Sequence, residues 1–208
     1  MGNGQDEKLQ LRAADLEDLS VIAGLVQDAL VAVDRGLSAD PDSMPLQGTR
    51  AMVLEGLGRY EEADELARAL VKKSPRDLGL YKLMARCRVR GGKRIEAMQV
   101  LEAGLTRNCT SGKCGSQPFD VDAGRMLARL YLEDRLDDNR AVELISQIKG
   151  AVRQPGPFEA YLDALVARNS ADPGAADAAR RLLGSLKPKD PLRGVIAEAF
   201  PETVRALT

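Results

Sequence analysis

Apolar residues recur along this chain at the spacing of an α-helix. Between Leu11 and Val33 they fall mostly three or four positions apart, which places them on one face of a helix. Residues 60–73 carry two glutamates in the first turn and two lysines in the last, the order that suits a helix dipole. No run of β-branched residues has the length of a strand. The pattern therefore predicts an all-α fold.

The predicted helices come in pairs joined by short turns. The clearest pair covers residues 45–57 and 60–73, with Asp42 or Ser43 as the N-cap and Gly58 in the turn. Later pairs are predicted over 120–132 with 139–152 and over 158–168 with 173–186, followed by a last helix over 191–200 that Pro201 ends.

One spacing relates the first three pairs. Small residues and prolines recur 34 positions apart, in three sets: Ala29, Ala63 and Ala97; Gly24, Gly58 and Gly92; Pro41 and Pro75. Two helices that pack closely need small side chains where they cross, with larger ones beside them. A fixed period of this kind predicts a stack of helix-turn-helix repeats.

Residues 44–109 resemble tetratricopeptide repeats, and residues 10–41 and 120–188 resemble them more loosely. The family pattern is met in part, because Arg50 stands where leucine is usual, Ala51 replaces glycine and Cys109 replaces proline. The resemblance implies a right-handed superhelical solenoid of about four to five helix-turn-helix repeats, closed by a C-terminal capping helix.

The domain organisation follows from the period and from one break in it. Ala97 and Ala141 lie further apart than one repeat, which indicates an insertion of about ten residues. We expect a flexible arm over 1–9 and a single helical-repeat domain over 10–208, with repeats 10–41, 44–77, 78–109, 120–153 and 157–188, an insertion loop over 108–119 and a C-terminal cap over 190–208.

Composition limits the partners and the location. Lys and Arg number 30 against 31 Asp and Glu, so the basic excess of a nucleic-acid binder is missing. No apolar run is long enough to span a membrane, and the first residues do not read as a signal peptide. We expect a cytoplasmic protein without membrane insertion. A periplasmic or extracellular location would apply if a leader had been removed and Cys109 were bonded to Cys114.

The sequence offers little for catalysis. It contains no histidine, which removes the commonest general base and the commonest metal ligand. Residues 110–113 contain fragments of a phosphate-binding loop without its spacing. We therefore expect no enzyme activity, no cofactor and no metal site.

A row of basic residues is the first candidate for binding. In tetratricopeptide repeats the first helix of each pair lines the concave surface. The inward positions of two successive pairs would then carry cations: Lys82, Arg86 and Arg90 in one, Arg125 and Arg129 in the next. Such a row suits an acidic peptide segment or a terminal carboxylate. The alternative is an ordinary solvated helix face.

The fifth repeat places Phe158, Tyr161 and Leu165 at the analogous positions. In a groove they would anchor a hydrophobic side chain of a ligand. The alternative is that they pack within the core, as helical apolar stripes most often do.

The cysteines are the last candidate. Cys109 and Cys114 flank a turn-rich stretch and would form a disulfide in an oxidising compartment or remain two reduced thiols. Lys113 beside Cys114 would lower the pKa of that thiol, which leaves redox regulation open. Cys87 is expected to be a small packing residue.

The resemblance implies a non-catalytic protein–protein interaction module. It would be an adaptor or an assembly and scaffold factor that binds a peptide or a partner helix in a concave, partly basic groove. Two alternatives stay open. The first is a self-associating solenoid, and hence a homo-oligomer. The second is a thiol-regulated component that acts through the Cys109–Cys114 loop.

Overall fold

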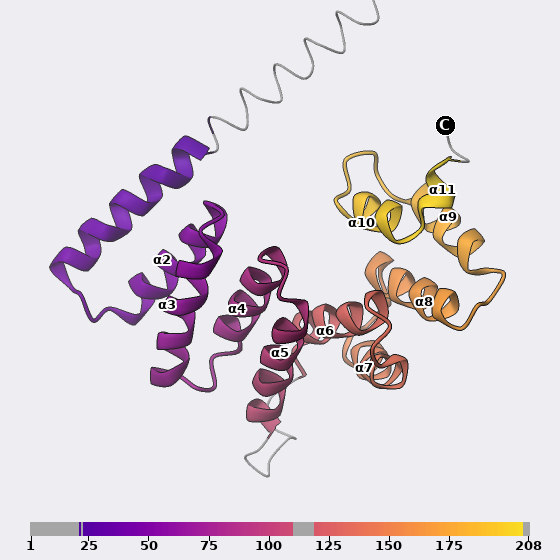
Figure 1. The fold of residues 1–208 in the computed structure, drawn as a ribbon, viewed down its shortest axis with the longest axis horizontal. Helices are drawn as coiled ribbons and strands as arrows, with labels where there is room; N and C mark the ends of the chain where they lie inside the picture. The colour runs from indigo at the N-terminus through magenta and orange to yellow at the C-terminus, as the bar shows by residue number, and fades with distance from the viewer. Residues whose placement is uncertain (1–20, 22, 110–118, 206–208) are drawn as a thin grey trace, which may run out of the picture. The chain divides into compact units, whose positions relative to one another are not determined.

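The computed structural model describes residues 21, 23–109 and 119–205, and every regular element among them is an α-helix (Figure 1). The chain divides into two units, Met1–Val100 and Leu101–Thr208, with the division inside one helix. After a first helix over residues 23–39, the elements are α2 (Met44–Gly56), α3 (Tyr60–Lys73), α4 (Leu78–Arg90), α5 (Arg94–Cys109), α6 (Val121–Glu133), α7 (Asp138–Ala151), α8 (Pro157–Asn169), α9 (Ala175–Ser185), α10 (Leu192–Ala199) and α11 (Pro201–Arg205).

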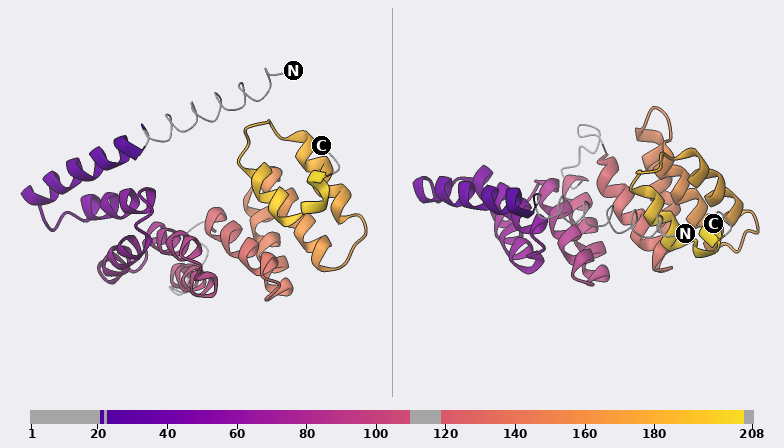
Figure 2. Two further views of the ribbon diagram at one scale, coloured as in Figure 1. Left: turned by 45° about the horizontal axis from the view of Figure 1, so that its top comes forward. Right: turned by 90° about the horizontal axis from the view of Figure 1, so that it is seen from above.

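Within each unit the helices pack as consecutive pairs (Figure 2). In the first unit α2 packs against α3 and α3 against α4, and in the second α6 packs against α7 and α8 against α9. The predicted helices match these elements to within about two residues at most ends, as is usual for helix boundaries. The all-α helical-repeat fold is confirmed. The assignment of residues 10–208 to a single domain stays a prediction.

Fully buried alanines mark the paired helices. Of the alanines in the 34-residue period, Ala63 and Ala97 are fully buried and Ala29 is half-buried. Four more alanines of the paired helices are also fully buried: Ala51, Ala85, Ala128 and Ala141. Leucines such as Leu54 and Leu70 fill the space beside them. Burying one such leucine contributes about 2 kcal/mol of transfer free energy, so the core is an alternation of small contacts and large fillers.

Four helix-to-helix turns share one backbone geometry. In each turn the N–H of one residue donates to the carbonyl five residues earlier, as in a Schellman motif: Arg59 to Leu54, Lys93 to Arg88, Leu136 to Tyr131 and Asp172 to Ala167. The residue before each donor has a positive φ, at Gly58, Gly92, Arg135 and Ala171. The first unit fills this position with glycine, and the second fills it with side chains that favour a negative φ.

The first helix departs from the expected repeat. Residues 23–39 form one helix, and Gly24 lies inside it although the period would place it in a turn. Leu30 and Val33 are its buried residues. Residues 10–20 and 22 lie outside the described residues, so the helix pair expected over 10–41 stays a prediction.

The C-terminal cap consists of α10 and α11, which pack on α8 and α9. Phe200 and Ile196 are buried between these helices, and Pro201 starts α11 where α10 ends. Arg168 on α8 donates to the carbonyl of Ala199 at 3.1 Å and lies over the ring of Phe200 at 5.6 Å. The expected capping helix is therefore present, followed by one short helix more.

The insertion leaves α5 at its end and returns at Phe119. The ring of Phe119 lies over Gly124 on α6, where an added Cβ atom would come within 2.5 Å of it. Because only glycine leaves that space, Gly124 lets the returning chain anchor on α6. Residues 110–118 lie outside the described residues.

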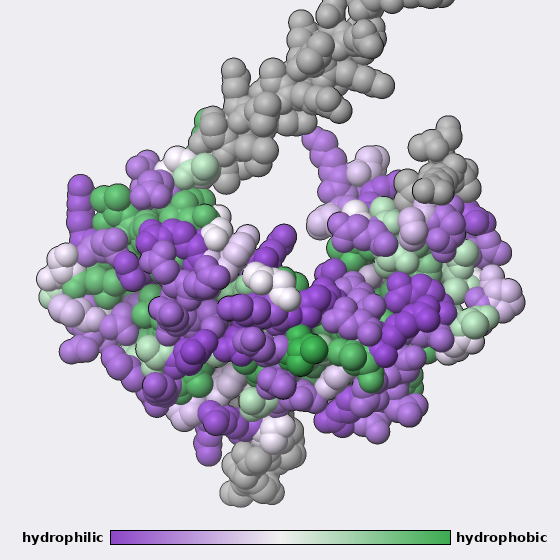
Figure 3. All heavy atoms as spheres, in the orientation of Figure 1, coloured by the Kyte–Doolittle hydropathy of each residue, from purple (hydrophilic) through white to green (hydrophobic). Residues whose placement is uncertain are grey.

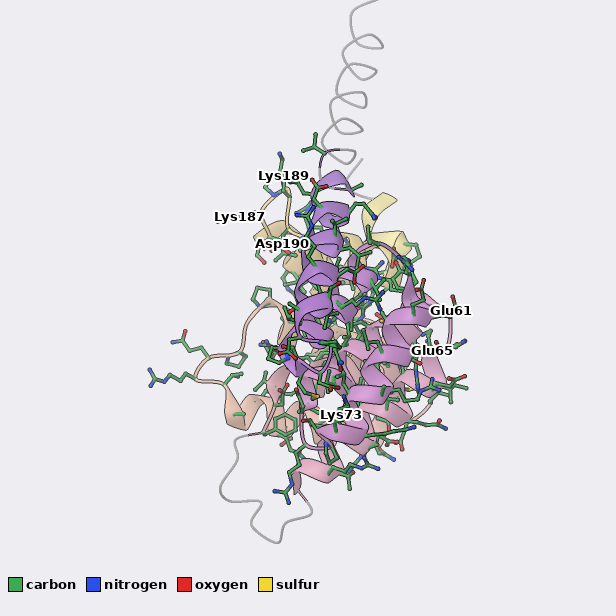
Figure 4. The ribbon with its side chains drawn as sticks, turned by 90° about the vertical axis from the view of Figure 1, so that its left-hand side faces the viewer. Glu61, Glu65, Lys73, Lys187, Lys189 and Asp190 are labelled. Carbon is green, nitrogen blue, oxygen red and sulfur yellow. The ribbon has the colours of Figure 1, made fainter. Side chains whose placement is uncertain are left out.

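Charged side chains cover the outer helix faces. Figure 4 shows Glu61 and Glu65 projecting from the first half of α3 and Lys73 near its end, the order that the helix dipole favours. Figure 4 also shows Lys187, Lys189 and Asp190 on the loop between α9 and α10. The carboxylate of Asp190 accepts the N–H of Leu192 at 2.9 Å and so supports the start of α10.

The shared turn geometry predicts opposite effects for two reciprocal substitutions. Gly58→Ala places a Cβ atom on a residue with φ of 76°, and we expect it to lower the free energy of unfolding by about 1 kcal/mol. Ala171→Gly removes a Cβ atom at φ of 56° and should raise it by up to about 1 kcal/mol. Urea unfolding followed by circular dichroism measures both, and equal signs would contradict the shared geometry.

Candidate functional site

A groove of about 400 Å³ runs between α2 and α4 in the first unit. We call it the α2/α4 groove. Apolar side chains supply much of its wall: Met44, Pro45 and Met52 from α2, Leu80 and Leu83 from α4, and Leu70 from α3. Met52 is more than half exposed, which is unusual for a large apolar side chain and places it at the mouth.

Two glycines line this groove, and one of them leaves open space. Gly48 on α2 and Gly79 on α4 both line it, and a Cβ atom on Gly48 would meet nothing within 4 Å. Gly79 lies in the first turn of α4, where its N–H donates to the carboxylate of Asp77 at 3.0 Å. That capping contact fixes the start of α4 beside the groove. The open space beside α2 therefore follows from the absence of a side chain at Gly48.

An ion pair closes one end of the groove. Nε and Nη2 of Arg86 on α4 donate to the two carboxylate oxygens of Glu55 on α2, at 2.6 and 2.7 Å. The hydrogen bond to Glu55 raises the pKa of Arg86 above its ordinary value. This bidentate pair joins two successive repeats and places a paired charge beside a groove whose lining also includes Thr49, Ser74 and Asp77.

The other basic residues predicted on α4 lie on either side of Arg86. Lys82 is half-buried one turn earlier and Arg90 is exposed one turn later, at the end of the helix. Spacings of four place the three cations on one face, as expected. Their role in binding an acidic segment stays a prediction.

In the second unit, the predicted basic residues form ion pairs with carboxylates of the same chain. Arg125 on α6 lies 2.6 Å from Glu159 on α8, and Arg129 lies 2.5 Å from Glu133 on α6. Burial raises the pKa of Glu159, but the N–H of Gly156 at 2.7 Å and the guanidinium of Arg125 lower it more, so the net pKa is below the ordinary value. Glu159 is thus a buried carboxylate that stays charged.

The predicted apolar residues of α8 divide between core and surface. Tyr161 and Leu165 are fully buried, which is the core-packing alternative, and Phe158 is half-buried. The rings of Phe158 and Tyr161 meet edge to face, with their centroids 6.0 Å apart. The Cζ atom of Arg125 lies 5.8 Å from the centroid of the Phe158 ring. Burial and then Glu133, which accepts the Tyr161 hydroxyl at 2.9 Å, raise the pKa of that hydroxyl. These residues join α6 to α8.

The thiols differ in what the structure describes. Cys87 is a buried free thiol on α4, and burial raises its pKa to about 11, so it carries little thiolate at neutral pH. Its expected packing role agrees with this burial. Cys109 is the last residue of α5. Cys114 lies outside the described residues, so the disulfide between the two cysteines stays a prediction.

Within 21, 23–109 and 119–205, no three His, Cys, Asp or Glu side chains gather closely enough to hold a metal ion. Across that part of the chain, helices with the length and apolar character needed to cross a membrane are absent.

Arg86 is the residue of the groove lining that the sequence predicted for binding. The other predicted residues lie outside that lining: Lys82, Arg90, Arg125, Arg129, Phe158, Tyr161 and Leu165. The sequence feature that could have indicated the groove is Gly48 and Gly79, each followed by large apolar residues on its own helix. Glycine has no side chain and therefore adds nothing to a pattern of apolar or charged positions, whereas a row of lysines and arginines does.

The fold is similar to that of solved tetratricopeptide repeat proteins. One from Parabacteroides merdae superposes with a TM-score of 0.63 at 15% identity, covering 97% of this chain and 75% of that one. A thermophilic TPR protein of Thermus thermophilus gives a TM-score of 0.56 at 20% identity, covering 92% and 95%. No family model matches the sequence, and no curated protein matches it either. The chain therefore has a tetratricopeptide-like repeat fold.

The two inter-repeat ion pairs predict unequal costs for the same substitution. Arg125→Ala leaves the carboxylate of Glu159 unpaired at 1% side-chain exposure, and we expect a loss of about 3 kcal/mol in unfolding free energy. Arg86→Ala leaves Glu55 at 19% exposure and should cost under about 1 kcal/mol.

The contribution of Glu159 to the unfolding free energy depends on pH. In the wild type the depressed pKa of Glu159 contributes stability above about pH 4, and this contribution is lost as pH falls through the folded-state pKa. The difference between wild type and Arg125→Ala should therefore narrow in acid. Denaturant titrations at pH 7 and at about pH 3 test this, and a constant difference would contradict the assignment.

Proposed function

We propose that this protein is a non-catalytic protein-interaction module whose α2/α4 groove receives apolar side chains of a peptide or a partner helix. The observation that carries the proposal is the groove itself, which is open to solvent, walled by methionine and leucine, and left open beside Gly48. Tetratricopeptide-like repeats present such surfaces between the first helices of successive pairs. An adaptor or scaffold role follows from this mode of binding.

The size of the groove sets the kind of ligand. A volume of about 400 Å³ lies at the lower end of the range for small-ligand pockets. It suits one or two large side chains rather than a whole cofactor. Buried apolar anchors of this kind usually supply most of the binding energy of a peptide, and the flexible Met44 and Met52 adapt to the shape of the anchor.

The charges beside the groove favour an acidic flank on the ligand. Lys82, Arg86 and Arg90 share one face of α4, where Arg86 is paired with Glu55. The positive charge of this face attracts carboxylates next to the apolar anchor. Because Arg86 already binds Glu55, we expect the flank to contribute more to the association rate and its salt dependence than to the affinity.

Filling the groove tests the proposal. Gly48→Leu places a side chain in open space on a helix, where it should leave stability unchanged or higher. Partners are first captured with the wild-type protein, and the affinity of the purified partner is then measured by calorimetry. We expect at least a tenfold loss for Gly48→Leu and none for Gly150→Leu, a matched change in α7 that also meets nothing within 4 Å. Undiminished binding by a folded Gly48→Leu variant would refute the groove.

Charge reversal tests the acidic flank separately. The double variant Lys82→Glu, Arg90→Glu should slow association with the same partner about tenfold at low salt and abolish most of the salt dependence. The control variant Lys187→Glu, Lys189→Glu carries the same change in net charge on the exposed loop before α10, which Figure 4 displays. Equal association rates for the two double variants would remove the acidic flank and leave the apolar groove in place.

A further inference from the structure

The first helix has an apolar face that the described chain leaves uncovered. Val21, Leu25 and Val31 are 60%, 63% and 46% exposed, although Leu30 and Val33 on the opposite face are buried. The exposed residues follow helical spacings of three, four and seven, so they form a single stripe. We call it the outer stripe, and its members are Val21, Leu25, Asp28, Val31, Ala32 and Arg35.

The position of this helix explains the exposure. The first helix lies at the edge of the first unit, with α2 and α3 on one side and no described element on the other (Figure 1). In Figure 3 hydrophobic side chains reach the surface over this end of the unit. A helix face that is exposed to solvent normally carries polar residues. The outer stripe departs from that rule.

Two opposite charges lie within the stripe. Asp28 and Arg35 are both exposed and stand seven residues apart, two turns along the same face, with Val31 and Ala32 between them. Neither side chain makes an ion pair or a hydrogen bond with the described residues. An acid and a base that flank an apolar centre are self-complementary when a second, identical helix runs in the opposite direction.

We infer that a second copy of this chain covers the outer stripe, with the two first helices antiparallel about a twofold axis. In that arrangement Asp28 of each copy faces Arg35 of the other, and Val31 of each packs on Ala32 of the other. An isologous interface makes every contact twice, so the pair gains two ion pairs around one apolar centre. A parallel arrangement would place like charges side by side and is disfavoured.

The contact is small, because each copy contributes three large apolar side chains at most. Interfaces of this size are weak and depend on protein concentration. We therefore expect a reversible dimer at high concentration rather than a permanent one. The outer stripe contains no residue of the α2/α4 groove, so the two surfaces are tested independently.

Charge reversal and mixing provide the test, with sedimentation velocity of the full chain over a range of concentrations. Asp28→Arg and Arg35→Asp each place like charges opposite one another twice, and each should weaken dimerisation about tenfold or more. An equimolar mixture of the two variants restores opposite charges at both contacts and should dimerise like the wild type. Glu65→Arg on α3 makes the same change in net charge as Asp28→Arg, but outside the stripe, and should leave dimerisation unchanged.

Three results would overturn the inference. A wild type that stays monomeric at all concentrations shows that no second copy binds, as expected if residues 1–20 occupy the stripe instead. Dimerisation that both single reversals leave intact assigns the interface to another surface. Failure of the mixture to recover the dimer, with both variants folded by circular dichroism, excludes the antiparallel pairing of Asp28 with Arg35.

Discussion

The close approach of paired helices at fully buried alanines is the constraint on which this structure depends. Ala51 and Ala63 in one pair, and Ala128 and Ala141 in another, are fully buried, so a larger side chain there would have to displace its neighbours. The backbones come near enough for leucines to interlock beside them, and the turns must then be tight. The Schellman turns satisfy this demand, so crossing and turn are two parts of one geometric solution.

Between successive pairs, charged contacts add to the apolar packing, in which α3 lies against α4 of the next pair. Glu55 with Arg86, and Arg125 with Glu159, connect the first helices of neighbouring repeats through charged hydrogen bonds. In the second unit these polar contacts continue through Phe158 and Tyr161 into the core. In the first unit they stop at the rim of the α2/α4 groove. Within each unit these charged pairs add directional contacts between the first helices of successive repeats.

Periodicity made the fold predictable and the site less so. The recurrence of alanine and glycine gave the helix pairs, because packing distance forces those residues directly. Arg135 and Ala171 occupy left-handed turn positions that no glycine signals, and Gly24 follows the period without forming a turn. The spacing of basic residues along α4 and α6 placed each set on one helix face. It did not reveal the carboxylates that pair with Arg86 and Arg125, which lie 31 and 34 residues away in the sequence. Partners across repeats are invisible to a pattern read along one helix.

The side chain of Arg168 has a consequence for how the second unit comes apart. Its guanidinium donates to Leu132 at the end of α6 and to Ala199 at the end of α10, while Asn169 beside it also reaches Leu132. Three elements thus share one anchor near the end of α8. Repeat proteins usually lose stability one module at a time, since each module touches only its neighbours. Here, shortening the chain before α10 would also loosen α6, so these helices melt as one cooperative block rather than fraying from the terminus.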